Sequence, residues 1–276
     1  MIKFLRYQGS KEHIVPLVNN LGLINTKHDR YIEPFVGSGT IFINLPDVFD
    51  EYIINDINPN IMSMWNALAK YSYSDYEDVY NEILTKFGDI KENKWSYYNF
   101  RDYYNTTFHF SDSDKKGLYL YFLTNSCINS MLRFGPNGMN QGFGNRLYFF
   151  TKEEHNSIHN KLKKTRIFDV DFSDMLRGAH HSFIYLDPPY IERPTTYSKG
   201  FEEQQLIELI TLINYLNGQN SIFYSDIETE ISDSVLKCGF TKITAKEMRN
   251  ISPLRESEFI EKNEVLYHNI KSRFFI

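Results

Sequence analysis

Short apolar runs alternate with longer amphipathic stretches over much of this 276-residue chain. Apolar runs bounded by turn residues predict strands at 31–34, 51–55, 165–170, 182–186, 221–224, 240–245 and 265–270. Helical spacing and capping residues predict helices at 10–22, from 41, from 58, at 202–217 and at 227–238. Strands that alternate with helices in this way predict an α/β fold built on a parallel sheet.

The alternation is interrupted between residues 57 and 165. Residues 73–107 and 114–127 have a helical pattern, and no strand is predicted between them. Residues 128–150 hold four of the fourteen glycines together with Pro136, a composition typical of a loop or a short hairpin. We therefore expect one domain formed by 1–56 and 166–276, and a helical insert at 57–165 with a hairpin at about 128–150.

The charge of the chain is distributed unevenly. The net charge is -5, yet residues 115–166 carry nine Lys and Arg against two Glu, a net charge of +7 that leaves -12 for the rest. A basic segment in an acidic chain can bind a polyanion, or it can be a solvated helix face. Charge alone does not decide between these two interpretations.

Several classes of protein are excluded by composition. Hydrophobic residues make up 42% of the chain, as in globular proteins, and no apolar run reaches the roughly 18 residues that a transmembrane helix needs. The N-terminal residues lack the apolar core of a secretory signal, so we expect a cytoplasmic protein. Two cysteines are too few for a disulfide framework or a cysteine-based zinc site, and we expect no metal.

A glycine turn follows the strand predicted at 31–34. Gly37 and Gly39 lie between that strand and an apolar helix start, and their lack of a side chain allows close approach by a nucleotide-like ligand. The third glycine of the dinucleotide motif is missing, which argues against a nicotinamide oxidoreductase, and the P-loop pattern is absent. Asp56, at the end of the next strand, is well placed to accept hydrogen bonds from ribose hydroxyls.

A second motif, Asp187-Pro188-Pro189-Tyr190, follows the strand predicted at 182–186. The prolines stiffen the turn and keep the chain extended up to Asp187. The turn presents a carboxylate, a proline carbonyl and an aromatic ring, which together suit a planar amine; the alternative is a rigid loop with a capping aspartate. Both motifs lie at carboxyl ends of strands, where ligands bind in parallel α/β sheets.

In combination, these motifs resemble S-adenosylmethionine-dependent DNA adenine-N6 methyltransferases of the Dam type. The resemblance covers nearly the whole chain, and the motifs follow the order of the family's α group: cofactor motif, recognition insert, catalytic motif. It rests on Tyr7-Gln8-Gly9-Ser10-Lys11, EPFVGSG at 33–39, NDIN at 55–58, NSMLRF at 129–134, GFGNR at 142–146 and DPPY at 187–190.

The resemblance implies a seven-stranded, mostly parallel, Rossmann-like methyltransferase sheet with an inserted helical target-recognition domain. It implies S-adenosylmethionine as the methyl donor, double-stranded DNA as the partner and flipping of the target adenine. The cofactor-binding residues it implies are Tyr7, Lys11, Phe35, Gly37, Gly39, Asp56, Asp171 and Phe172. The catalytic residues are Asp187, Pro188, Pro189 and Tyr190, and the DNA-binding residues are Asn129, Met131, Arg133 and Arg146.

GATC is the favoured target, although two departures from the family pattern keep related sequences open. Gly142 stands where the family commonly has Pro, and the stretch between Arg133 and Gly142 is one residue shorter than in several members. Cytosine-N4 methyltransferases usually have Ser in place of Asp187, so the aspartate favours adenine. A catalytically silent DNA-binding protein of the same fold is the other alternative, and we expect a monomer or weak dimer.

Overall fold

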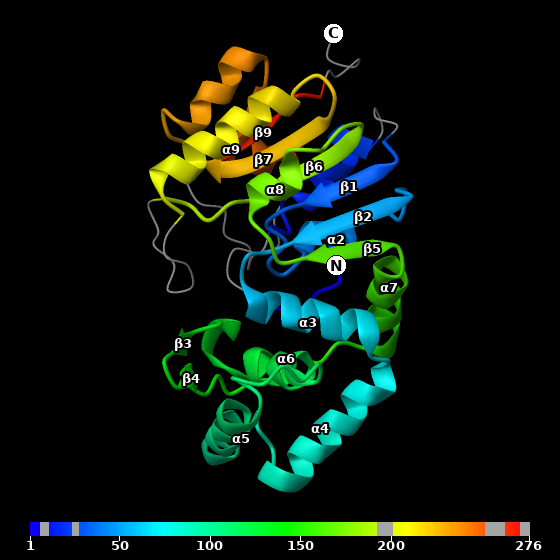
Figure 1. The fold of residues 1–276 in the computed structure, drawn as a ribbon, viewed down its shortest axis with the longest axis vertical. Coiled ribbons are helices and arrows are strands. Elements are labelled where there is room, and N and C mark those ends of the chain that lie inside the picture. Colours follow the sequence, from blue (N-terminus) through cyan, green and yellow to red (C-terminus); the bar gives the residue numbers. More distant parts are fainter. Residues whose placement is uncertain (6–10, 24–27, 192–200, 252–262, 271–276) are drawn as a thin grey trace.

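A seven-stranded sheet forms the centre of the computed structural model, which describes residues 1–5, 11–23, 28–191, 201–251 and 263–270 (Figure 1). The strand order is β5-β2-β1-β6-β7-β9-β8, and all neighbours pair in parallel except β9, which runs against β7 and β8. The strands are β1 (Arg30–Glu33), β2 (Glu51–Asn55), β5 (Thr165–Phe168), β6 (Ser182–Leu186), β7 (Ser221–Ile227), β8 (Thr241–Thr244) and β9 (Glu264–His268). The predicted Rossmann-like sheet, seven-stranded and mostly parallel, is confirmed.

The order of the strands reverses between β1 and β6. From β1 the chain builds outward through β2 and β5, and from β6 it builds in the opposite direction through β7. The loops that leave adjacent strands on either side of such a reversal diverge, which opens a crevice at their carboxyl ends. The glycine turn follows β1 and the DPPY motif follows β6, so the topology places both predicted motifs at this crevice.

Successive side chains of the strands enter two hydrophobic clusters on opposite faces of the sheet. Tyr31 packs in one cluster and Ile32 in the other, and Tyr52 and Ile53 divide in the same way. One face is covered by α8 (Phe172–Leu176), α9 (Glu203–Leu216) and the 3-10 helix η3 (Ser232–Cys238). The other is covered by α1 (Val15–Leu17), the π-helix η1 (Val18–Leu23), α2 (Thr40–Asn44) and α10 (Ala245–Ile251).

The insert lies beyond the β5 edge of the sheet (Figure 1). Its elements are α3 (Pro59–Lys70), α4 (Tyr73–Phe87), α5 (Lys94–Thr107), α6 (Lys116–Ser126), the 3-10 turn η2 (Ile128–Ser130), the hairpin strands β3 (Phe134–Gly135) and β4 (Gly138–Met139), and α7 (Lys152–Leu162). The ring of Phe4 contacts both Trp65 of α3 and Tyr121 of α6, with centroids 4.7 and 5.6 Å apart. The core therefore continues without a break from the sheet into the insert.

Two helix predictions are wrong in detail, and one stretch predicted as helical is divided in two. The helix predicted at 10–22 begins at Val15, and Pro16 lies in its first turn, where a missing N–H costs no helical hydrogen bond. Residue 10, where the predicted helix begins, lies outside the described residues. The polar stretch 73–107 is two helices, because Gly88 adopts a positive φ of 82° at the end of α4.

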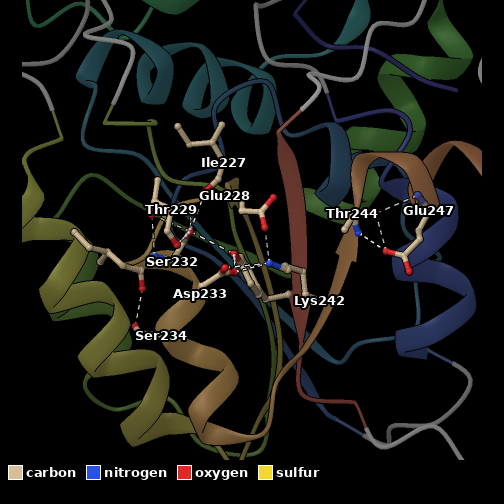
Figure 2. Close-up of polar contacts among 11 residues, drawn as sticks. Ile227, Glu228, Thr229, Ser232, Asp233, Ser234, Lys242, Thr244 and Glu247 are labelled. Carbon is tan, nitrogen blue, oxygen red and sulfur yellow. Dashed lines mark hydrogen bonds and ion pairs between the residues drawn. The ribbon is translucent and has the colours of Figure 1, made fainter.

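The helix predicted at 227–238 is also wrong, because β7 continues to Ile227 and only Ser232–Cys238 is helical. The intervening turn is fixed by reciprocal hydrogen bonds between Thr229 and Ser232. Figure 2 shows the neighbouring Lys242 ammonium between the carboxylates of Glu228 and Asp233, 2.7 and 2.9 Å away, which ties β8 to this turn. Among the described residues, no helix is both long and apolar enough to span a bilayer.

Candidate active site

The glycine turn after β1 is held from two sides. Oδ2 of Asp56 accepts a hydrogen bond from the Gly37 N–H at 3.0 Å, and Nε1 of Trp65 donates to the Gly37 carbonyl at 3.0 Å. Gly39 has a φ of 68°, and a Cβ there would lie 2.4 Å from the Trp65 ring. A Cβ on Gly37 would meet nothing within 4 Å, so the turn is packed beneath and open above.

Asp56 is half-buried and lies directly after β2. Its other oxygen accepts the N–H of Asn58 at 2.9 Å, which begins α3. Burial raises the pKa of Asp56 to about 6, although its two backbone hydrogen bonds oppose this shift. The carboxylate is therefore placed in the crevice and titrates close to neutral pH.

Three strand ends are joined by the buried side chain of Asn55. Its Nδ2 donates to the carbonyls of Pro34 and Val170, both at 3.0 Å, and its Oδ1 accepts the Val170 N–H at 2.9 Å. Two apolar side chains remain exposed at these ends, Ile57 at 64% and Val170 at 37%. The sequence analysis quoted Asn55 and Ile57 within the NDIN motif but gave them no role. It missed Val170, for which the only signal was an apolar side chain directly before Asp171.

The predicted adenine pair, Asp171-Phe172, lies beyond β5. Asp171 caps α8 by accepting the Ser173 N–H at 2.8 Å. The ring of Phe172 lies 5.4 Å from that of Phe35, centroid to centroid, and Phe201 packs against both. The structure thus brings together the predicted cofactor residues Phe35, Gly37, Gly39, Asp56, Asp171 and Phe172, whereas Tyr7 lies outside the described residues.

Lys11 is placed beside the DPPY motif rather than in solvent. Its Nζ lies 3.1 Å from Oδ1 of Asp187 and 5.0 Å from the centroid of the Tyr190 ring. The same ammonium is 3.8 Å from Oε1 of Glu264, which is 3.4 Å from Nε2 of His13. The half-buried carboxylate of Asp187, the buried carboxylate of Glu264 and the buried ammonium of Lys11 therefore meet at the carboxyl ends of β6 and β7.

Burial controls the electrostatics of this pocket. It raises the pKa of Asp187, with a further rise from Glu264 and an opposing effect of Lys11. For Lys11 burial alone would lower the pKa, but Asp187, Tyr190 and Glu264 outweigh it and keep the pKa well above its usual range. Lys11 therefore remains charged.

Two more carboxyl groups face the same region. Burial raises the pKa of Asp226 to about 6, and its Oδ2 accepts a short hydrogen bond from the Tyr224 hydroxyl. Burial raises the pKa of Glu33 to about 8, despite a hydrogen bond from the Tyr31 hydroxyl at 2.6 Å. The sequence analysis quoted Glu33 within the EPFVGSG motif but gave it no role. It missed Asp226 and Glu264, for which the signal was an ionisable side chain beside an apolar strand, and His13, for which there was none.

The four predicted DNA-binding residues lie on two segments that the backbone joins. The Ile128 N–H donates to the Gly142 carbonyl, and the Gly144 N–H donates to the Ser126 carbonyl, both at 2.9 Å. Asn129, Arg133 and Arg146 are exposed and Met131 is half-buried. The predicted hairpin is present as β3 and β4, and in Figure 1 it lies on the same side of the molecule as the carboxyl ends of the strands.

Several known methylases are similar to this chain in sequence. One curated relative, the DNA adenine methylase of Serratia marcescens, is 28% identical over 190 residues, which cover 68% of this chain and 66% of that protein, just under two-thirds of its length. The DNA adenine methylase of Haemophilus influenzae is 25% identical over 243 residues, 84% of this chain and 82% of that protein. Modification methylase StsI of Streptococcus sanguinis is 26% identical over 228 residues, 78% of this chain and 33% of that protein.

A family model covers most of the chain. The model of the family described as D12 class N6 adenine-specific DNA methyltransferase matches residues 7–251. That range includes the glycine turn, the insert with its hairpin and the DPPY motif. The chain therefore belongs to the D12 class of N6 adenine-specific DNA methyltransferases.

Proposed function

We propose that this protein transfers a methyl group from S-adenosylmethionine to N6 of an adenine in a short duplex DNA motif, with GATC the favoured target. The observation that carries the proposal is the position of Asp187. Its half-buried carboxylate, on a rigid proline turn beside the glycine turn, lies 3.1 Å from the ammonium nitrogen of Lys11 and accepts an N–H there. The exocyclic amino group of adenine likewise offers N–H donors to a carboxylate.

The residues at the ends of β1, β2 and β5 fit the methyl donor. The open space above Gly37 leaves room for a ligand against the backbone, and Asp56 supplies a carboxylate for ribose hydroxyls. Phe35, Phe172 and the exposed side chains of Ile57 and Val170 offer apolar surface to a flat base, with the Asp171 carboxylate at its edge. When bound there, S-adenosylmethionine would supply a methyl group activated by a positively charged sulfur.

At the target base, Asp187 and the Pro188 carbonyl would each accept one N–H of the amino group. Two such bonds draw N6 toward tetrahedral geometry and free its lone pair to form the new N–C bond, while the C–S bond breaks with its electron pair left on sulfur. N6 then releases one proton, and Asp187, whose pKa burial raises, is the acceptor within reach. Pro189 stiffens the turn and Tyr190 would stack on the base.

A base paired within a duplex does not reach a carboxylate that is only 19% exposed, so the target adenine would be flipped out. In this proposal residues 1–56 and 166–276 form the catalytic domain and residues 57–165 recognise DNA. The exposed Lys and Arg side chains of residues 115–166, which do not include the buried Lys161, would supply phosphate affinity. Arg133 and Arg146 would read guanine edges, and Asn129 and Met131 would contact neighbouring bases. We expect the enzyme to act as a monomer or weak dimer.

The deciding experiment measures transfer of labelled methyl from S-adenosylmethionine to unmethylated duplex DNA, followed by nucleoside analysis and methylation-aware sequencing. N6-methyladenine within one short motif supports the proposal, and the motif identifies GATC or a relative. N4-methylcytosine contradicts the adenine assignment. No transfer, with DNA and S-adenosylmethionine both bound, favours the silent DNA-binding protein.

A further inference from the structure

The last helix of the insert binds the C-terminal end of α2. Lys161 of α7 points its ammonium at three carbonyl groups there and donates to those of Phe42, Ile43 and Leu45 at 2.8, 3.5 and 2.6 Å. These carbonyls belong to the last turn of α2, where no further helical N–H is available. A cation at this position also complements the negative end of the helix.

The same helix binds the C-terminal part of α3. Nε2 of His155 lies 3.1 Å from the Tyr71 carbonyl, and Nδ1 of His159 lies 3.0 Å from the Leu68 carbonyl, so each ring nitrogen donates. Side chains on successive turns of α7 thus hold two separate helices. The contacts of Lys161 differ from those of the two histidines because Lys161 places a positive charge in the protein interior.

Both helices held by α7 begin at the proposed cofactor site. α2 starts at Thr40, directly after the left-handed Gly39, and α3 starts after the Asp56–Asn58 turn. α2 has only five residues, so a displacement at its C-terminal end reaches the glycine turn within about 8 Å. From the opposite side, the carboxyl group of Glu33 accepts the Phe42 N–H at 3.2 Å.

Lys161 is unusually buried for a lysine, with 6% of its surface exposed. Its ammonium lies 5.4 Å from the Phe42 ring centroid and 5.3 Å from that of Tyr52. Burial lowers the pKa of Lys161 to about 8; Asp47 and Glu33 oppose this shift and Lys164 adds to it. A buried amine is retained at such a site only where its hydrogen bonds are satisfied, and the α2 carbonyls satisfy them.

We infer that Lys161 is a positioning residue that holds α2, and through it the glycine turn, in the geometry that binds S-adenosylmethionine. The inference rests on the proposed function for its ligand, and it assigns a residue of the DNA-recognition insert to the cofactor site. Lys161 acts through its bonds to α2, which leads to the glycine turn, so we expect it to affect the affinity for S-adenosylmethionine and not the affinity for DNA.

The test compares S-adenosylmethionine binding by calorimetry in Lys161→Met, Lys161→Arg and Lys163→Met. Lys163 is exposed at the same end of α7. Within the described part of the chain its ammonium donates only to the side-chain oxygen of Asn160, so it is the matched control. We expect Lys161→Met to raise the dissociation constant about ten-fold. Lys161→Arg should recover most of the affinity, and Lys163→Met should equal wild type in its affinity for S-adenosylmethionine. DNA affinity should be unchanged in the two Lys161 variants.

Wild-type affinity in Lys161→Met overturns the inference, whereas failure of the wild type itself to bind S-adenosylmethionine overturns the proposed function. A second measurement guards against a variant that does not fold, which circular dichroism would detect. The affinity of the wild type for 5′-methylthioadenosine, which has no group titrating between pH 7 and 10, should fall as pH rises through about 8. The decrease in affinity should persist in Glu33→Gln, which removes the titrating carboxyl group beside α2. The inference is overturned if the affinity of the wild type does not change with pH, or if the decrease disappears in Glu33→Gln.

Discussion

The ammonium of Lys11 and the carboxylate of Asp187 form an ion pair with an N–O distance of 3.1 Å, in which the lysine side chain is 9% exposed and the aspartate side chain 19%. Each partner comes from a different part of the chain, Lys11 from the segment before β1 and Asp187 from the turn after β6. The pair joins a residue predicted to bind the cofactor to a residue predicted to be catalytic. It also makes the ionisation of Asp187 depend on the presence of Lys11.

Replacing Lys11 by Met should move the acid limb of the pH–rate profile to higher pH. Asp187 accepts amino protons only when ionised, so activity falls as pH falls through its pKa, and loss of the neighbouring cation raises that pKa further. The measurement is methyl transfer under saturating S-adenosylmethionine from pH 5 to 9. Lys70→Met, at an exposed site, is the control, and an unshifted limb in Lys11→Met would contradict the coupling.

Replacing Asp187 by Asn should lower the methyl-transfer rate by about 10²–10³-fold or more, because an amide is a weaker acceptor and no proton acceptor. Binding of S-adenosylmethionine should stay within a few-fold of wild type, since Asp187 lies outside the strand ends assigned to the donor. Single-turnover kinetics measure the methyl-transfer rate, and calorimetry measures the affinity for S-adenosylmethionine. Activity within a few-fold of wild type would remove Asp187 from the catalytic set.

The affinity for S-adenosylmethionine should fall as pH falls through about 6. The folded pKa of Asp56 is raised to about 6, so below that pH its carboxyl is protonated and loses an acceptor for ribose hydroxyls. In Asp56→Asn the affinity should be lower at pH 7.5 and nearly independent of pH from 5 to 7.5. An equal pH dependence in the variant and the wild type would assign the titration to another group.

Gly39→Ala should destabilise the fold, whereas Gly178→Ala should not. At Gly39 the new Cβ would lie 2.4 Å from Trp65 and the φ of 68° disfavours any L side chain, while a Cβ on Gly178 meets nothing within 4 Å. We expect Gly39→Ala to lower the free energy of unfolding by about 2 kcal/mol or more. Thermal melts of both variants measure this, and equal melting temperatures would refute the packing argument.

Arg133→Ala should relax discrimination at one base pair of the target by about 1–3 kcal/mol. Arg133 is exposed on the segment that leads into the hairpin, where a guanidinium is free to reach a guanine edge. Arg177→Ala is the control, because Arg177 pairs with Asp174 at the exposed end of α8. Specificity is measured as the ratio of rates on the preferred site and its single-base variants, and an unchanged ratio removes Arg133 from the recognition set.

The sheet could be predicted from the sequence because its strands are apolar runs that end at Gly, Pro, Asp or Asn. Strand 182–186 was predicted with its exact bounds for this reason. Helix α7 was missed although Thr151 and Glu154 form a capping box, because its polar sequence carries little apolar periodicity. The predicted strand at 221–224 is three residues shorter than β7, because Ser225 and Asp226 interrupt the apolar pattern. Both side chains are nevertheless buried in the strand.

The candidate site was predicted where local motifs carried it and missed where distant segments meet. Gly37 and Asp187 stand in recognisable turns, so their chemistry could be assigned before their geometry. Glu264 reaches the pocket only because β9 inserts antiparallel beside β7, and one sequence does not reveal that pairing. The position of Lys11 beside Asp187 depends on the same kind of long-range packing, so the sequence did not predict this ion pair.

Side chains of α5 hydrogen-bond to the main chain of the segment 138–141, which includes β4 of the proposed recognition hairpin. The side-chain amide of Asn105 donates to the Met139 carbonyl at 2.9 Å and accepts the Met139 N–H at 2.8 Å, and the Tyr97 hydroxyl donates to the Gln141 carbonyl. Main-chain bonds of this kind persist whichever side chains the hairpin carries. Base-reading residues can therefore be exchanged over evolutionary time, and new target sequences acquired, while the frame that presents them keeps its shape.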